Sequence, residues 1–257
     1  MSKLGKKPII LRMTKSRWTL VIWGCVLSTT CHATELQAVT FAKTPGQIYV
    51  PFRAVGEALD LEVTWDSASQ KAGLGTTQFD ESDYSYLFDG TKMIPVRLLE
   101  RVGAKIDFAP DNGSVTLTLN GKSVPVQLGE KRVEVSISEQ KLRAWQGDIM
   151  VMETNISSGR PGHATPRGKF KAGPVKDVMH YSRLYDNAPM PWSVQVHGDV
   201  FIHGYHSVPR RPASHGCIRM PLTGKNAARY FFGWVDLGTP VTIAEGFTVD
   251  QGRSSAK

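Results

Sequence analysis

Cys217 is the residue of this chain whose surroundings best suit covalent chemistry. It lies in "RRPASHGCIRMP" (210–221), with His215 and Gly216 before it and Arg219 after it. A cysteine thiolate attacks carbonyl carbons, and a nearby imidazolium or helix N-terminus lowers the pKa of the thiol. The segment around this thiol holds four of the seven histidines of the chain: His197, His203, His206 and His215. These neighbours make Cys217 a candidate nucleophile.

His203 is a candidate base. Apolar and polar residues alternate over 193–196 and 199–202, which predicts two strands around a turn and places His203 at a strand end. A loop rich in Pro and Arg then returns the chain to Cys217. His197 is the competing base. Glycine at 216 lets the backbone approach a substrate, and the amides of Gly216 and Cys217 are candidate donors to an oxyanion.

A metal site is the alternative use of these residues. His203, His206, His215 and Cys217 number four potential zinc ligands. Their spacing lacks a repeated Cys or His pair, and the loop is rich in Pro and Gly. We therefore expect neither a metal nor another cofactor.

The segment "IHGYHSVPRRPASHGCIRMP" resembles the active-site signature of the L,D-transpeptidases, cysteine enzymes that remodel bacterial peptidoglycan. "SSGRPGHATPRGKF" (157–170) and "MPW" (190–192) resemble further motifs of that family, and the resemblance covers about residues 131–245. Only ten residues separate His203 from Ser214, a shorter loop than in many members.

The resemblance implies a role for each site residue. Cys217 would be the nucleophile and His203 the general base, oriented by a backbone carbonyl near Gly204. His215, Arg219 and Ser214 would line the substrate cleft, with Arg219 holding a carboxylate of the peptide stem through its planar fork. The alternatives are that Ser214 and His215 hydrogen-bond the turn and that Arg219 forms a salt bridge holding the cysteine loop. The alternative for Thr165–Gly168 is a simple hairpin turn.

The resemblance also implies the reaction. The enzyme would attack a peptidoglycan tetrapeptide stem, release D-alanine and transfer the acyl group to an amine of a second stem, forming a 3→3 cross-link; carbapenems would acylate Cys217. Water as acceptor would make the protein an L,D-carboxypeptidase, and a protein acceptor would make it a wall-attachment enzyme. A non-catalytic cell-wall-binding protein is the hypothesis from a different class.

The expected fold is α+β overall. Alternating residues over 132–138, 148–157 and 239–246 predict strands, and only 222–235 is typical of a helix. These elements predict a mainly-β sandwich or open barrel over 128–249, with Cys217 beside a helix start.

An internal repeat precedes this domain. "YVPFRAVGEALDLEVTWD" (49–66) and "MIPVRLLERVGAKIDFAP" (93–110) share Pro-x-Arg, a helix-like stretch and a strand ending in Trp65 or Phe108. The pair predicts a small α+β module over 34–127, and it resembles the copper amine oxidase N-terminal-like domain. The module has no histidine, so we expect no metal there. Arg53 and Arg97 either contact a wall polymer or form internal ion pairs; the boundary is expected near 121–132.

Residues 1–33 have the pattern of a secretory signal peptide. Six basic residues and no acid precede a short apolar run at 18–27, and Ala33 suits cleavage; the alternative is an uncleaved anchor. Without this leader, 25 basic residues face 23 acidic ones, a balance that gives no reason to expect nucleic-acid binding. Cys25 and Cys31 leave with it, so Cys217 would remain as an unpaired thiol in an exported protein of the periplasm or cell wall. Residues 250–257 are predicted to be a loose tail.

Overall fold

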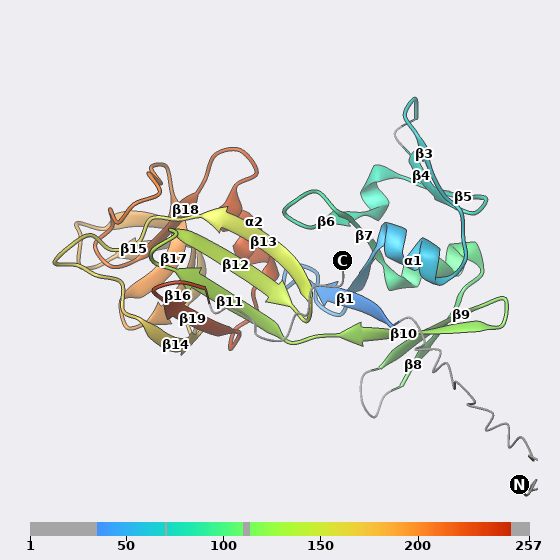
Figure 1. Cartoon of the computed structure of the whole chain (residues 1–257). Helices are drawn as coiled ribbons and strands as arrows, with labels where there is room; N and C mark the ends of the chain where they lie inside the picture. The colour runs from blue at the N-terminus through green and yellow to red at the C-terminus, as the bar shows by residue number, and fades with distance from the viewer. Residues whose placement is uncertain (1–34, 70, 110–113, 248–257) are drawn as a thin grey trace, which may run out of the picture. The chain divides into compact units, whose positions relative to one another are not determined.

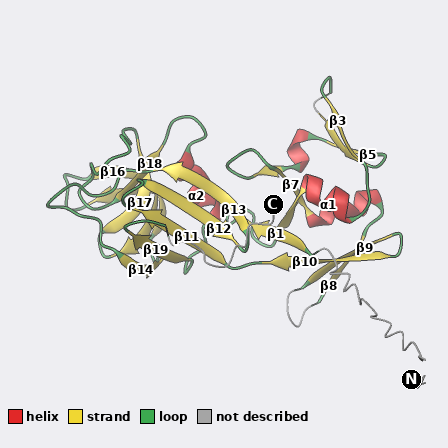
Figure 2. Ribbon diagram, in the orientation of Figure 1, coloured by secondary structure: helices red, strands yellow, loops and turns green. Residues whose placement is uncertain are grey.

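The computed structural model describes residues 35–69, 71–109 and 114–247, all of which belong to one compact unit, Ala33–Lys257. The predicted signal peptide and tail lie outside the described residues. Within them, no helix is long and apolar enough to cross a membrane. Strands predominate over helices throughout (Figure 2), so the protein is mainly β.

The first half of the described chain contains a seven-stranded sheet, in the order β6-β7-β2-β1-β10-β9-β8, and a three-stranded sheet, β3-β4-β5 (Figure 1). Its helical segments are α1 (Phe52–Ala58), η1 (Glu81–Asp83) and η2 (Val96–Val102). Its strands are β1 (Leu36–Thr40), β2 (Ile48–Pro51), β3 (Val63–Asp66), β4 (Lys71–Leu74), β5 (Thr77–Phe79), β6 (Ser85–Tyr86), β7 (Lys92–Pro95), β8 (Lys105–Phe108), β9 (Val115–Leu119) and β10 (Lys122–Leu128).

The sequence repeat corresponds to β2-α1-β3 and β7-η2-β8. Proline ends the strand in both units, because it lacks the N–H that a strand needs and its fixed φ suits a helix start. The two units differ in that η2 is a 3₁₀ helix, and β3 and β8 enter different sheets. Trp65 and Phe108, which end the repeats, remain 50% and 48% exposed.

The second half contains two sheets, β13-β12-β11-β19-β14 and β15-β16-β17-β18, and one α-helix, α2 (Ala227–Trp234). The strands predicted over 132–138, 148–157 and 239–246 and the helix predicted within 222–235 are confirmed. The strands are β11 (Lys131–Ser136), β12 (Lys141–Gln146), β13 (Ile149–Asn155), β14 (Gly168–Lys171), β15 (Lys176–Ser182), β16 (Ala188–His197), β17 (Val200–Tyr205), β18 (Ile218–Pro221) and β19 (Pro240–Ala244).

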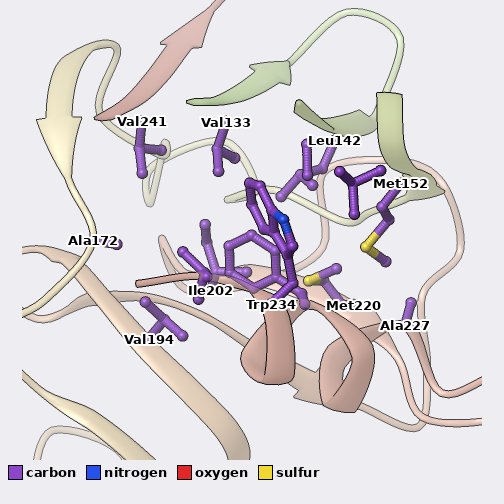
Figure 3. Packing of buried hydrophobic residues seen from close by; sticks show 14 of the residues in the cluster. Val133, Leu142, Met152, Ala172, Val194, Ile202, Met220, Ala227, Trp234 and Val241 are labelled. Carbon is purple, nitrogen blue, oxygen red and sulfur yellow. The ribbon is translucent and has the colours of Figure 1, made fainter. Parts of the chain in front are cut away.

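One hydrophobic core unites both sheets and α2. Alternate residues of β11 and β12 point inward, as the period of a half-buried strand requires. In Figure 3 the indole of Trp234, from α2, lies among side chains of both sheets such as Val133 and Ile202. Trp234 is 1% exposed, so the helix is fixed to the strands that carry the site.

The same core extends into the first half of the chain. Phe41 and Tyr49 belong to it, and Phe41 packs edge-on against Tyr230 with 6.2 Å between ring centroids. Backbone hydrogen bonds add to the contact: Lys43 N donates to Gly233 O at 2.9 Å, and Phe88 N donates to Val151 O at 3.0 Å. The division into domains at 127/128 therefore stays a prediction, with buried contacts crossing that position.

Candidate active site

Two parallel strands bring His203 and Cys217 to the same place. β17 pairs with β18 in a register that sets Ile202 opposite Ile218 and His203 opposite Arg219. Both isoleucines are fully buried and anchor the strands in the core. Cys217 lies directly before β18, whereas α2 begins only at Ala227. The prediction of a helix start beside Cys217 is wrong, because residues 218–221 continue the sheet instead.

Ser214 holds the turn that presents Cys217. Its hydroxyl donates to Cys217 O at 2.5 Å and accepts from Gly216 N at 3.1 Å. Gly216 has a φ of 117°, a backbone conformation that favours glycine. Ser214 is 1% exposed and lines the pocket with Cys217, and its hydroxyl is engaged by the turn, so its contact with substrate stays a prediction. The Gly216 amide is likewise engaged by Ser214, which removes it as an oxyanion donor in this conformation.

Thr165 clamps the same turn to a distant segment. Its hydroxyl donates to Gly216 O and accepts from Gly159 N, both at 2.8 Å. Glycine is required at 159, since a Cβ there would lie 1.9 Å from His163 O. The interpretation of Thr165–Gly168 as a simple hairpin turn therefore missed a positioning residue. The only signal in the sequence was the resemblance of 157–170 to a family motif.

Gln140 is a second positioning residue that the sequence did not indicate. Its side-chain amide donates to Ser158 Oγ at 2.7 Å and accepts from Ser158 N at 2.9 Å. Ser158 O in turn accepts from Ser214 N at 2.9 Å. Gln140, which is 3% exposed, thus supports the turn before Cys217 through Ser158 and Ser214.

His203 is buried and oriented by the main chain. Its Nδ1 lies 2.9 Å from Gly204 O, so Nδ1 carries the proton and Nε2 is the free acceptor of the neutral ring. Burial, with a smaller effect of the Arg219 charge, lowers the pKa of His203 to about 4. Gly204 has no room for a side chain, since a Cβ would lie 2.3 Å from Leu222 Cδ2. The imidazole is therefore a base held in one tautomer at neutral pH.

Cys217 is a half-buried thiol. Burial raises its pKa, and a backbone hydrogen bond with Phe201 and the charge of Arg219 offset only part of this. Sγ lies 3.5 Å from Asp199 O, which accepts the thiol proton. With the pKa of the thiol raised and that of His203 lowered, the neutral pair is favoured over thiolate and imidazolium at neutral pH.

A pocket of about 170 Å³ joins these groups. Its charged residues are Asp199 and Arg219, and the Arg219 guanidinium lies 4.0 Å from the centroid of the Tyr205 ring. Arg219 makes no salt bridge with any residue that the structure describes, so the predicted alternative of a salt bridge to the cysteine loop is wrong. The guanidinium is left free for an anionic group at the pocket.

His215 forms the exposed rim of this pocket. Its ring stacks at an angle on Tyr185, 4.6 Å between centroids, and its Nε2 lies 2.8 Å from Arg160 Nη2. Because the guanidinium only donates, Nε2 accepts this hydrogen bond. Partial burial and the charge of Arg160 lower the pKa of His215. His215 and Arg160 thus bring a polar, cationic edge to the entrance.

His197 and His206 lie outside the pocket. His197 ends β16 and packs on Phe170 at 5.1 Å, and His206 stacks on Tyr205 at 4.3 Å. Across the described ranges, no three His, Cys, Asp or Glu side chains gather closely enough to hold a metal ion. The pocket therefore brings together Cys217, His203, His215 and Arg219 but not the competing base or a zinc ligand set.

Comparison with protein families matches residues 130–243 to YkuD, the L,D-transpeptidase catalytic domain. The match supports, over these residues, the family resemblance that the sequence motifs indicated. A comparison with curated proteins found no match. The resemblance of residues 34–127 to a copper amine oxidase N-terminal-like domain stays a prediction.

Solved structures that match include L,D-transpeptidases from three bacteria. The protein from Stackebrandtia nassauensis is 24% identical with a TM-score of 0.41, over 45% of this chain and 55% of its own. The one from Xylanimonas cellulosilytica is 29% identical with a TM-score of 0.41, over 46% and 62%. The one from Mycobacterium smegmatis is 17% identical with a TM-score of 0.41, over 82% and 100%. The chain thus spans less than two thirds of the length of the first two of these proteins.

Proposed function

We propose that the protein is an exported L,D-transpeptidase that acts on peptidoglycan stem peptides through a Cys217 acyl-enzyme. The observation that carries this proposal is the meeting of a thiol, a neutral imidazole and an unpaired guanidinium in one pocket. All three groups lie within the residues that match the L,D-transpeptidase catalytic domain.

The first step forms a thioester. His203 Nε2 takes the proton from Cys217 as Sγ attacks the carbonyl carbon of the L,D peptide bond in a tetrapeptide stem. The Cys217 amide is the proposed donor to the oxyanion, since the Gly216 amide is engaged by Ser214. The imidazolium then returns the proton to the leaving amine, and D-alanine departs.

The second step resolves the thioester. An amine of a neighbouring stem, the side-chain amine of its diamino acid, attacks the thioester carbonyl while His203 takes its proton. The thiol leaves protonated and a 3→3 cross-link results. Water in place of the amine would give an L,D-carboxypeptidase with the same residues, and a protein amine would give wall attachment.

Cys217 and His203 are both neutral before the reaction, which determines when the proton moves. With the pKa of the thiol raised and that of the imidazole at about 4, both groups stay neutral at neutral pH. Proton transfer must therefore accompany attack on a bound carbonyl. Arg219 would fix that carbonyl by binding a carboxylate of the stem through its planar fork.

The deciding experiment is mass spectrometry of disaccharide-tetrapeptide incubated with the protein, with Cys217→Ala as control. Cysteine-dependent dimers that lack one D-alanine are the expected result. Tripeptide monomers alone would identify a carboxypeptidase. Unchanged substrate, from a folded protein whose Cys217 also takes no carbapenem by intact mass, would refute the nucleophile and leave a wall-binding protein.

A further inference from the structure

The carboxylate of Asp199 lies at the candidate active site but has no role in the proposed first step. Asp199 is exposed in the turn between β16 and β17, and it lines the pocket of about 170 Å³. Its backbone oxygen accepts the thiol proton of Cys217 at 3.5 Å, so the residue lies directly beside the nucleophile. Within the described residues its side chain makes no salt bridge. The carboxylate is therefore available to a ligand.

An anion at this position opposes the formation of a thiolate. The pKa of Cys217 is raised chiefly by burial, and the negative charge of Asp199 raises it further. A neutral side chain at 199 would leave the thiol more acidic. The first step of the mechanism therefore gives no reason for a carboxylate beside Sγ. The second step does, because an amine must then reach the thioester.

Asp199 and Arg219 carry opposite charges at two ends of the site. Asp199 precedes β17, and the parallel register of β17 and β18 sets Arg219 opposite His203. The same register continues to Cys217, which lies directly before β18 and level with Phe201. Along the strands, the thiol thus lies between the negative and the positive residue. Because the carboxylate of the donor stem is assigned to Arg219, the other end is left for a cation.

A second pocket, of about 270 Å³, adjoins the first at Asp199. The two pockets share Ser182, Met190 and Asp199, whereas Arg219 lines only the first. Arg183 lines the second pocket, but it is exposed and makes no salt bridge with Asp199. A second molecule in this pocket can therefore reach Asp199 while a donor stem is bound at Arg219.

We propose that Asp199 binds the side-chain ammonium of the acceptor stem and holds its nitrogen at the thioester, which selects an amine over water. The inference rests on the proposed action on stem peptides. The bound ammonium releases one proton to solvent, and the neutral amine keeps an N–H···O hydrogen bond to the Asp199 carboxylate. Its lone pair attacks the thioester carbonyl while His203 takes a second proton. The amide forms, and the Cys217 thiol leaves with that proton.

A binding experiment tests this without relying on turnover. Cys217→Ala removes the nucleophile, and its amide resonances are followed during titration with a disaccharide-tripeptide whose diamino acid has a free side-chain amine. The matched probe is the same compound with that amine acetylated. We expect resonances around Asp199 to shift, with tighter binding of the free amine. Asp199→Asn in the Cys217→Ala protein should weaken the free-amine compound about tenfold and leave the acetylated one unchanged.

Asp177→Asn is the matched control, since Asp177 is an exposed carboxylate of β15 that lines neither pocket. It should bind both compounds as the Cys217→Ala protein does. No preference for the free amine, or a preference that survives Asp199→Asn, would overturn the proposal. Amine-selective binding through Asp199 by a protein that forms no product would refute only the catalytic function.

Product ratios separate a specificity role of Asp199 from a structural one. With Cys217 in place, Asp199→Asn should lower the ratio of cross-linked dimer to tripeptide about tenfold. Its alkylation by iodoacetamide should be no slower than the parent's, because loss of the anion lowers the pKa of the thiol. Slower alkylation together with an unchanged product ratio would show that Asp199 only supports the turn, and would overturn the proposal.

Discussion

Replacing Thr165 with valine should damage both the stability of the protein and the reactivity of Cys217. Valine keeps the shape of threonine but removes the hydroxyl that joins Gly159 N and Gly216 O at 2.8 Å each. Thr165 is 7% exposed and both glycines are buried, so the change leaves one N–H and one C=O unpaired in the interior. At about 1–3 kcal/mol for each of the two unpaired groups, the free energy of unfolding should fall by about 2–6 kcal/mol.

The effect on chemistry follows from geometry. Without the clamp, Gly216 and Cys217 are free to shift against His203, and a displacement of about 1 Å can cost on the order of 100-fold in rate. We expect acylation of Cys217 by a carbapenem to slow by about 10–100-fold, measured by intact mass over time. Urea unfolding followed by tryptophan fluorescence gives the stability.

Thr165→Ser is the matched control because it retains the hydroxyl and loses one methyl group. Its stability should stay within about 1 kcal/mol of the parent, and its acylation rate should be close to the parent's. Equal unfolding midpoints and acylation rates for Thr165→Val and the parent would refute the clamp. Equal damage by serine and valine would show that the methyl group matters instead of the hydroxyl.

Further predictions concern ionisation and roles at the pocket. The pKa of His203 is about 4 in the folded protein and about 6.5 in the unfolded protein, so the unfolded state binds a proton first as the pH falls. The free energy of unfolding should therefore drop by about 3 kcal/mol between pH 6.5 and pH 4. Urea titrations at several pH values should show a smaller loss in His203→Gln. Since burial raises the pKa of Cys217 from 9.0, its alkylation by iodoacetamide should keep accelerating above pH 9, and a plateau near neutral pH would instead reveal a preformed thiolate. His203→Gln should abolish turnover while His197→Gln should not, and the reverse pattern in a stem-peptide assay would reassign the base. Arg219→Gln should raise the KM for the tetrapeptide about tenfold or more, whereas an unchanged KM would exclude a stem carboxylate as its ligand.

The parts of the site that could be predicted are those written in one continuous stretch. His203 and the segment from Ser214 to Arg219 lie close in sequence, and the alternation before His203 indicated a strand ending there. The long-range supports could not be found this way. Thr165 and Gly216 are 51 residues apart, and a hydrogen bond across that distance depends on the whole sheet arrangement. Four residues of β18 are too few to display a period, so the strand after Cys217 escaped detection.

The fold of the second half was predicted because its strands alternate clearly, but its core was only partly foreseen. Phe41 follows an ordinary short strand, and nothing in its neighbourhood indicates that it packs against Tyr230. Burial of that kind is decided by the partner surface, which local periodicity does not report. For the same reason the sequence did not indicate that the Arg97 guanidinium lies 5.4 Å from the centroid of the Phe108 ring.

The buried contact of Phe41 and Lys43 with α2 has a consequence for engineering this chain. The second half of the chain should not fold unchanged when it is moved alone into another protein, because residues near Phe41 in the first half contribute to its hydrophobic core. A graft of residues 128–249 onto another protein would carry Tyr230 and Trp234 without the covering that residues 39–43 provide. A transplant that also includes residues 39–43 preserves the packing surface of α2 and, through α2, the support of the strands that carry the site.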